Sequence, residues 1–262
     1  MRLYGETMEG IPGIDREDVG RLTVFIRDTV KNAGCSGVVI GLSGGIDSAV
    51  VTKLAVDALG ADKVLNIFMP SATTPKDDMK CTSEFSASLG TEYRIVDISS
   101  SVAALSSALE LKDDDRLGRG NLSARCRMAV LFDTARRTNR IVLGTSNKSE
   151  MMMGYFTKFG DGACDAVPIV NLYKTQVREL ASLIGIPEEF ITKPPSAGLW
   201  EGQTDEGEMG ISYDKLDTVL YRLDSMGDDD ISKETGVSVE KVAEIRKRVA
   251  SAAHKRNPAI RP

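Results

Sequence analysis

The chain has 262 residues, of which 42% are hydrophobic and 27% are charged, and its formal net charge is −5. This length suits one large α/β domain or two small ones, and the acidic balance disfavours a nucleic-acid coat protein, which needs a basic surface. No run approaches the roughly 18 apolar residues of a membrane span and no secretory leader is apparent, so we expect a cytoplasmic protein with no membrane partner.

The cysteines and the histidine give no sign of a zinc site. Cys35, Cys81, Cys126 and Cys164 form no C-x-x-C pair, and His254 is the only histidine. Zinc sites combine closely spaced cysteines and histidines. We interpret the four cysteines as reduced thiols.

In chain order, apolar periodicity and turn residues predict alternating helices and strands. The predicted helices are 15–32, 47–59, 75–89, 122–138 and 174–184, and 213–255 is read as short helices. The predicted strands are 37–42, 64–69, 93–98 and 141–144. The alternation favours an α/β fold, doubly wound, with a mostly parallel five-stranded sheet, helices on both faces and a helical C-terminal part. We expect a single domain over 1–262, because neither an internal repeat nor a clear linker interrupts it.

The loop after the first predicted strand is the strongest chemical signal. It reads Gly41, Leu42, Ser43, Gly44, Gly45, Ile46, Asp47 and Ser48. Its glycines let backbone N–H groups surround a phosphate, its serines add hydroxyl donors, and the next helix points its N-terminus at the anion. Asp47 repels a bare phosphate, which indicates a metal ion between the two. The loop lacks the lysine of a Walker A motif.

This loop resembles the S-G-G-x-D-S loop of the N-type ATP pyrophosphatases, which activate a substrate as an adenylate. Three further segments are similar to those of ammonia-dependent NAD synthetases: GNLSAR at 120–125, GTSNKSE at 144–150, and GYFTKFGDG at 154–162 continuing to Asp165. The resemblance covers about residues 15–256 and implies a fold of the adenine nucleotide α-hydrolase type. It also implies amidation of deamido-NAD with ammonia, driven by ATP through an adenylated carboxylate, to give NAD, AMP and pyrophosphate.

The resemblance implies residue roles as well. The ATP contacts, besides the loop at 41–48, are Thr145, Lys174 and Ser196. The deamido-NAD contacts are Arg125, Lys158, Asp165, His254 and Lys255. Asp47 and Glu150 are the implied Mg²⁺ ligands, and carboxylate oxygens suit that ion. The candidate catalytic groups are Asp47, Lys174 and Asp161, where Asp161 is a hypothesis for orienting ammonia.

One position departs from the family pattern. Some relatives carry an arginine just before the Leu-Pro that ends the second strand, where it meets ATP. Here the corresponding stretch is Phe68, Met69 and Pro70. The contact is therefore missing or is made by another residue.

A polar, glycine-rich segment at 194–210 is long enough to be a mobile lid. An adenylated intermediate is lost to water if it is exposed, so a closing lid is expected.

The partners follow from the chain's length and from the resemblance. Only about 35 residues precede the first predicted strand, which leaves no room for a glutaminase domain, so free ammonia is the expected nitrogen source. The sequence leaves open a separate glutaminase subunit. The resemblance implies a homodimer.

Three alternatives compete with this interpretation. A tRNA-thiolating ATP pyrophosphatase needs catalytic or iron–sulfur cysteines and a basic RNA-binding face. A DNA-binding regulator is suggested by residues 230–249, which resemble a helix-turn-helix with Arg246, Lys247 and Arg248 as phosphate contacts. The acidic charge speaks against both, so no nucleic-acid partner is expected. The third alternative is an inactive nucleotide sensor on the same fold.

Overall fold

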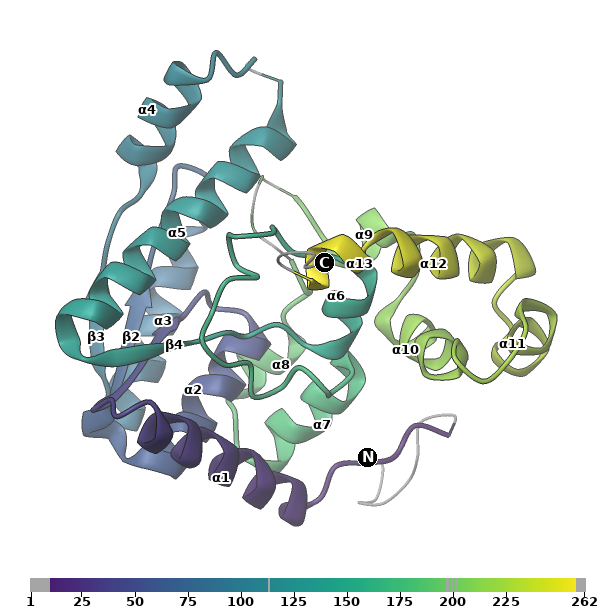
Figure 1. Cartoon of the computed structure of the whole chain (residues 1–262), viewed down its shortest axis with the longest axis horizontal. Helices are drawn as coiled ribbons and strands as arrows, with labels where there is room; N and C mark the ends of the chain where they lie inside the picture. The colour runs from purple at the N-terminus through teal and green to yellow at the C-terminus, as the bar shows by residue number, and fades with distance from the viewer. Residues whose placement is uncertain (1–9, 113, 197, 199, 201, 258–262) are drawn as a thin grey trace, which may run out of the picture.

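The computed structural model of the protein describes residues 10–257 except 113, 197, 199 and 201. Three positions of the predicted lid and both ends of the predicted domain therefore lie outside the described residues. Four parallel strands form the central sheet (Figure 1), in the order β3-β2-β1-β4. They are β1 (Gly37–Gly41), β2 (Val64–Phe68), β3 (Glu92–Ile95) and β4 (Arg140–Leu143). In the register, Val38 of β1 lies beside Val64 on one side and Ile141 on the other.

The prediction of a fifth strand is wrong for the described residues. In its place, a single parallel bridge joins Leu143 to Ala166. The Gly144 N–H donates to the Ala166 carbonyl at 2.8 Å, and the Asp165 N–H donates to the Val142 carbonyl at 2.9 Å. Pro168, two residues further on, has no N–H to continue a ladder.

Helices follow the strands and fill the C-terminal part of the chain. They are α1 (Arg16–Asn32), α2 (Ile46–Leu59), the 3₁₀ turn η1 (Ala61–Lys63), α3 (Lys76–Leu89), α4 (Ser99–Ala108), α5 (Arg116–Thr138), α6 (Lys148–Met153), α7 (Lys174–Leu183), α8 (Glu188–Thr192), α9 (Asp205–Met209), α10 (Tyr213–Arg222), α11 (Asp228–Thr235), α12 (Val239–Ser251) and α13 (Ala253–Arg256). The sequence pattern missed α4, none of whose residues is buried, because an exposed helix leaves no apolar stripe to read. Within the described residues, no helix is both long and apolar enough to cross a membrane.

Alternating residues of the strands divide the core into two layers, because successive side chains of a strand point to opposite faces. Val38 and Ile40 pack in the cluster that includes residues of α1, α2, α7 and α8. Val39, between them, packs in the cluster that includes Cys126 and Ala135 of α5. Helices therefore cover both faces, and the prediction of a doubly wound parallel sheet is confirmed.

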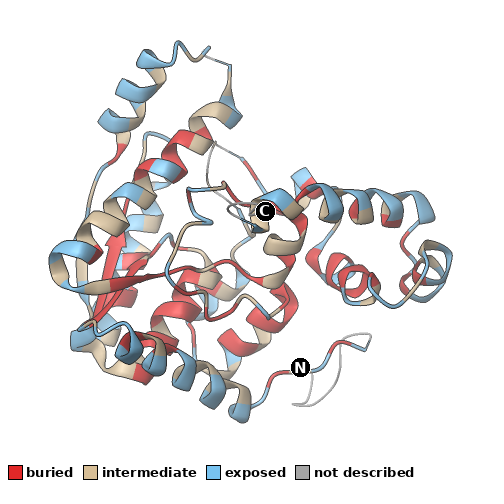
Figure 2. Cartoon of the chain, in the orientation of Figure 1, coloured by how far each residue is buried: buried red, intermediate tan, exposed pale blue. Residues whose placement is uncertain are grey.

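The C-terminal helices have a core of their own. Tyr213 and Leu216 of α10, Ile231 of α11 and Ile245 of α12 form a separate apolar cluster, which also takes in Ile11 from the N-terminal segment. In Figure 2 α10 is drawn largely as buried, and it packs against α11. The predicted helical C-terminal part is present.

Candidate active site

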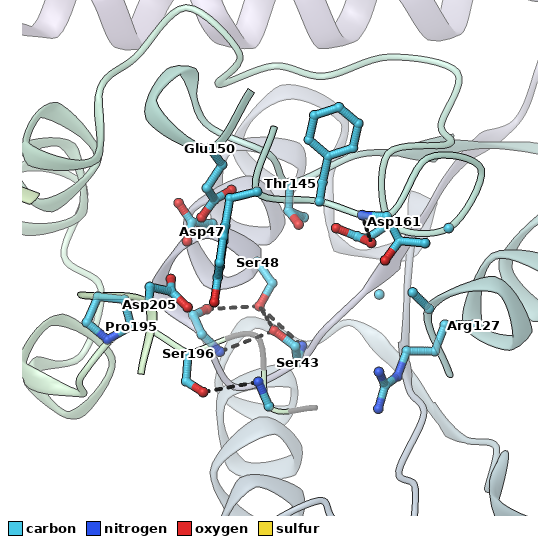
Figure 3. Close-up of a pocket in the computed structure, with 18 of the residues that line it drawn as sticks. Ser43, Asp47, Ser48, Arg127, Thr145, Glu150, Asp161, Pro195, Ser196 and Asp205 are labelled. Atoms are coloured by element: carbon cyan, nitrogen blue, oxygen red, sulfur yellow. Dashed lines mark hydrogen bonds between the residues drawn. The ribbon is translucent and has the colours of Figure 1, made fainter. Parts of the chain in front are cut away.

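The phosphate loop leaves the carboxyl end of β1 and enters α2. The Ser48 hydroxyl donates to the Gly45 carbonyl at 2.9 Å and accepts from the Ser43 N–H at 3.2 Å, which folds the loop back on itself (Figure 3). Gly44 has φ +82°, a conformation that favours glycine. Within the described part of the chain, the N-cap of α2, Gly45, makes no side-chain hydrogen bond to the first N–H groups of the helix. Such a helix start is suited to bind an anion.

A buried charged cluster lies at the start of α2. The Lys174 ammonium donates to Asp47 Oδ2 and, at 3.4 Å, to Glu150 Oε1. The Asn147 amide donates to the other Asp47 oxygen at 2.9 Å. Lys174 is only 2% exposed, so the cluster lies away from bulk water. Two carboxylates thus converge on one cation.

Burial and mutual charge shift the titration of this cluster. Burial and the neighbouring Asp47 carboxylate raise the pKa of Glu150, although Lys174 opposes the shift. Burial alone lowers the pKa of Lys174, but the attraction of Asp47 and Glu150 outweighs burial and raises it above its ordinary value. Lys174 is therefore held as a cation.

Two helix starts, those of α6 and α7, position Glu150 and Lys174 in the cluster. Asn147 and Glu150 form a reciprocal capping box at the start of α6. The Ser149 hydroxyl donates to Asp217 at 2.5 Å and accepts from the Lys174 N–H at 3.0 Å. The second oxygen of Asp217 accepts from the N–H of Thr175 at 2.9 Å. A carboxylate on α10 thus fixes the starts of α6 and α7, which carry Glu150 and Lys174.

The donor set fits Mg²⁺ in the form that nucleotide sites use. Among the described residues, no group of three His, Cys, Asp or Glu side chains is arranged to hold a metal ion by itself. Mg²⁺ in nucleotide sites is commonly held by one or two carboxylates together with substrate phosphates. Asp47 and Glu150, which already share a cation, supply that number of oxygen ligands.

A cavity of about 520 Å³ opens over the loop and the cluster, which is an ordinary size for a small-molecule site. It brings together predicted residues from six segments of the chain. Its lining includes Ser43, Asp47, Ser48, Thr145, Glu150, Asp161, Lys174, Ser196 and Lys255. Figure 3 shows many of them around one space.

Asp161 lies in the cavity wall. Its carboxylate accepts from the Thr157 N–H at 2.9 Å, and the Thr157 hydroxyl donates to Asn121 at 2.8 Å. The segments GYFTKFGDG and GNLSAR are thus in direct contact. The protein packed around Asp161 raises its pKa, against the opposing charge of Arg127.

Four predicted deamido-NAD contacts, Arg125, Lys158, Asp165 and His254, do not line the cavity. Three of them form one chain of contacts outside it. Arg125 donates to the Lys158 carbonyl at 3.5 Å, and Lys158 donates to the His254 carbonyl at 2.8 Å. Asp165 accepts from the Val142 N–H at 2.8 Å. In one copy of the protein, the side chains of Arg125, Lys158 and Asp165 therefore bond to neighbouring backbone groups outside the cavity.

Sequence reasoning missed several charged residues that line the cavity, among them Arg127 and Asp205. The Arg127 guanidinium donates to the Met69 carbonyl at 3.1 Å, so an arginine from α5 lies where the second strand lacks one. Asp205 of α9 accepts from the Tyr213 hydroxyl at 3.1 Å, while its buried Oδ1 has no hydrogen-bond partner among the described residues. Arg127 lies two residues after the GNLSAR segment, so its position could have identified it as a site residue. For Asp205, the sequence offered no indication of such a role except its place in the predicted lid.

The helix-turn-helix interpretation conflicts with the side chains of α12. Arg246 donates to Asp228 at 2.7 Å and to the Leu223 carbonyl at 2.7 Å. Arg248 donates to the Met153 carbonyl at 3.2 Å. Because both arginines bind the protein itself, they are poorly placed to contact DNA phosphates.

Comparison with known proteins gives one consistent result. A family model described as NAD synthase matches residues 18–259. The NH(3)-dependent NAD(+) synthetase of Methanosarcina mazei is 50% identical over 239 residues, covering 90% of this chain and 93% of that protein. The protein of the same name from Methanocaldococcus jannaschii is 46% identical, covering 97% of this chain and 96% of its own.

Solved structures agree in fold. An NMN synthetase from Francisella tularensis has a TM-score of 0.82 and 39% identity, covering 94% of this chain and 98% of that one. An NH3-dependent NAD synthetase from Campylobacter jejuni, in complex with the nitrate ion, has a TM-score of 0.80 and 32% identity, covering 95% of this chain and all of that one.

Proposed function

The chain belongs to the NAD synthase family, and on this premise we propose that it is a ligase that amidates deamido-NAD with ammonia. ATP is the co-substrate, and the products are NAD, AMP and pyrophosphate. The observation that carries the proposal is the phosphate loop at 41–48, joined to the Asp47–Lys174–Glu150 cluster at the carboxyl edge of the sheet. Ligands bind open α/β sheets at this edge.

The reaction has two steps. In the first, a carboxylate oxygen of the nicotinic acid ring attacks the α-phosphorus of ATP, and the bond between that phosphorus and the bridging oxygen breaks. The departing pyrophosphate is held by the loop N–H groups and the Ser43 and Ser48 hydroxyls. In the second, ammonia attacks the carbonyl carbon, the bond to AMP breaks, and ammonia gives up a proton. Asp161, open to the cavity with a raised pKa, is placed to accept it.

Asp47 and Glu150 are the proposed ligands of Mg²⁺, which when bound supplies positive charge to the phosphates. Lys174 supplies a fixed positive charge in the same place, since its pKa is raised. A nucleophilic side chain is not required, because ATP provides the covalent activation. The site acts by positioning and by electrostatic stabilisation.

The segment at 194–210 is the proposed lid. Gln203 and Asp205 are 7% and 3% exposed, and both line the cavity. The Tyr155 hydroxyl, from the loop after α6, donates to Glu208 at 2.5 Å. These contacts hold the second half of the segment against the site, where it limits the entry of water. We also propose a homodimer, in which Arg125, Lys158, Asp165 and His254 contact deamido-NAD at the junction between two copies.

The test is an assay of the purified protein with Mg-ATP, deamido-NAD and an ammonium salt, in which NAD, AMP and pyrophosphate are all measured. We expect the three products in equal amounts. If ATP is cleaved to AMP and pyrophosphate only with another carboxylate, the substrate assignment fails and the adenylation chemistry stands. If no acid is turned over, the chain is an inactive sensor or lacks a subunit.

A second substrate belongs in the same assay. The structural similarity to an NMN synthetase, at 39% identity, makes the mononucleotide counterpart of deamido-NAD a candidate. The ratio of kcat/KM for the two acids decides between them. A ratio above about 100 in favour of deamido-NAD is expected if the second nucleotide makes binding contacts.

A further inference from the structure

Lys193, the residue that follows α8, reaches over the phosphate loop. Its ammonium donates to the Gly44 carbonyl at 3.2 Å and to Asp78 Oδ1 at 2.5 Å. Asp78 lies in the first turn of α3, and its carboxyl carbon would be 3.3 Å from a Cβ on Gly44. Both side chains line the cavity. An ion pair therefore rests directly against the loop that binds phosphate.

The two side chains of this ion pair have opposite effects on a nearby anion. The Asp78 carboxylate repels a phosphate placed at Gly44, whereas the Lys193 ammonium attracts it. The Asp78 side chain is 15% exposed and the Lys193 side chain 38%, so lysine is the more accessible partner. A lysine ammonium on its flexible stem has three donors and moves readily between acceptors.

Lys193 is separate from the other cation of the site. Lys174 binds Asp47 and Glu150, at the start of α2 and on α6. Lys193 instead contacts Gly44, three residues before Asp47. The two lysines therefore act on different parts of the loop, and the loss of one leaves the other's ion pairs in place.

We propose that Lys193 is a second phosphate-binding cation of the ATP site. Before nucleotide binds, Lys193 is paired with Asp78. On binding of ATP, Lys193 exchanges its bond to Asp78 for a bond to the β- or γ-phosphate, and it remains on pyrophosphate after adenylation. This inference rests on the proposed function only for the identity of the nucleotide. The chemistry recognised is that of a di- or triphosphate.

The test measures binding of magnesium pyrophosphate to the whole protein by titration calorimetry, without deamido-NAD or ammonia. Lys193→Gln should raise the dissociation constant at least about tenfold, because a charge-assisted hydrogen bond is lost. Lys193→Arg should keep most of the affinity. Lys80→Gln is the matched control, since Lys80 on α3 is 76% exposed and lies 3.9 Å from Glu84. Equal affinity of Lys193→Gln and Lys80→Gln would overturn the proposal.

The Asp78→Asn variant distinguishes phosphate binding by Lys193 from a purely structural role of the Lys193–Asp78 ion pair. If Lys193 binds phosphate, removing the competing carboxylate should tighten pyrophosphate binding several-fold. If the ion pair only shapes the loop, the same substitution should weaken binding, and the proposal fails. Thermal unfolding of each variant identifies loss of fold. Since amidation is not measured, a failure here is distinct from a failure of the proposed function, which would appear as absence of NAD in the full assay.

Discussion

Lys174 is the residue on which the charges of the site converge. It is 2% exposed, and it pairs with both Asp47 and Glu150. Without this cation the two buried carboxylates would repel each other, because little water is present to screen their charges. The same cation is placed beside the phosphate loop, where negative charge builds during adenylation. Its structural role and its proposed chemical role therefore share one position, and removing it should affect both stability and turnover.

Lys174→Gln should lower kcat by at least about 100-fold, which is the usual effect of removing one preorganised electrostatic contact. The variant should also unfold at lower temperature, because Asp47 and Glu150 lose their shared partner. The measurements are steady-state kinetics and thermal unfolding. Lys215→Gln, on an exposed position of α10, is the control. A Lys174→Gln enzyme with unchanged kcat would remove Lys174 from the mechanism.

Asp217 carries a pH dependence that can be measured. Burial raises its pKa from 3.8 to about 6, against the hydrogen bonds from Ser149 and Thr175. The folded protein therefore keeps a proton between these pH values that the unfolded chain has released. The stability contributed by this group is fully present below about pH 4 and is lost as the pH rises through about 6.

We therefore expect the wild type to lose stability relative to Asp217→Asn as the pH rises from 4 to 7. The change should be on the order of 3 kcal/mol, since each unit of pKa shift corresponds to about 1.4 kcal/mol. Denaturant unfolding at several pH values measures it. Asp214→Asn, on the exposed side of the same helix with its side chain 60% exposed, is the control. A constant difference between wild type and Asp217→Asn would contradict the expectation.

At the scale of elements, the predicted lid is tied to the loop after α6. The Tyr155 hydroxyl donates to Glu208, and the Gln203 amide donates to both, at 3.4 Å and 3.2 Å. Burial and the neighbouring carboxylates raise the pKa of Tyr155, so the phenol keeps its proton. The hydroxyl is thus a permanent donor that joins two segments about fifty residues apart.

Tyr155→Phe should loosen this connection. We expect ATP to be cleaved without a matching yield of amide, because water reaches the adenylated intermediate. The ratio of NAD to AMP should fall by at least about twofold, and limited proteolysis within 194–210 should become faster. Tyr221→Phe, on α10 and 43% exposed, controls for loss of a phenol elsewhere. An unchanged ratio would show that this contact does not protect the intermediate.

At the scale of the whole molecule, α4 extends away from the body of the protein (Figure 1). Leu105 on α4 and Leu109 just after it are 43% and 59% exposed. Leu117, at the start of α5, is 64% exposed and also lines the cavity. Exposed large apolar side chains on a projecting element are typical of an interface between chains. This surface is where we place the contact of the proposed homodimer.

Replacing Leu105 and Leu109 together by Asp should weaken the dimer by at least about tenfold in dissociation constant, because apolar area at the contact is lost and charge is added. Sedimentation equilibrium measures this constant. Val24→Asp, on α1 and 47% exposed, is the control. A wild-type chain that sediments as a monomer at all concentrations would refute the dimer.

Much of the fold and of the ATP site was readable from the sequence, because these features are local. The alternation of strand and helix sets a parallel sheet, and the backbone of a glycine–serine loop between β1 and α2 is suited to bind anions. Asp47, Ser43 and Ser48 belong to one short segment, so their proximity needs no tertiary knowledge. The family resemblance supplied the distant Glu150 and Lys174, which the structure brings to Asp47.

The remaining features were decided by tertiary structure. Asp217, Arg127 and Lys193 take their roles from contacts across 68, 58 and 149 residues of chain, which no local pattern encodes. The number of strands also depended on a hydrogen-bond ladder that stops after one bridge at Ala166. The sequence by itself determined which chemistry the chain carries, since that chemistry resides in a continuous loop. Only folding determined which distant charges surround it, since burial and pairing exist only in three dimensions.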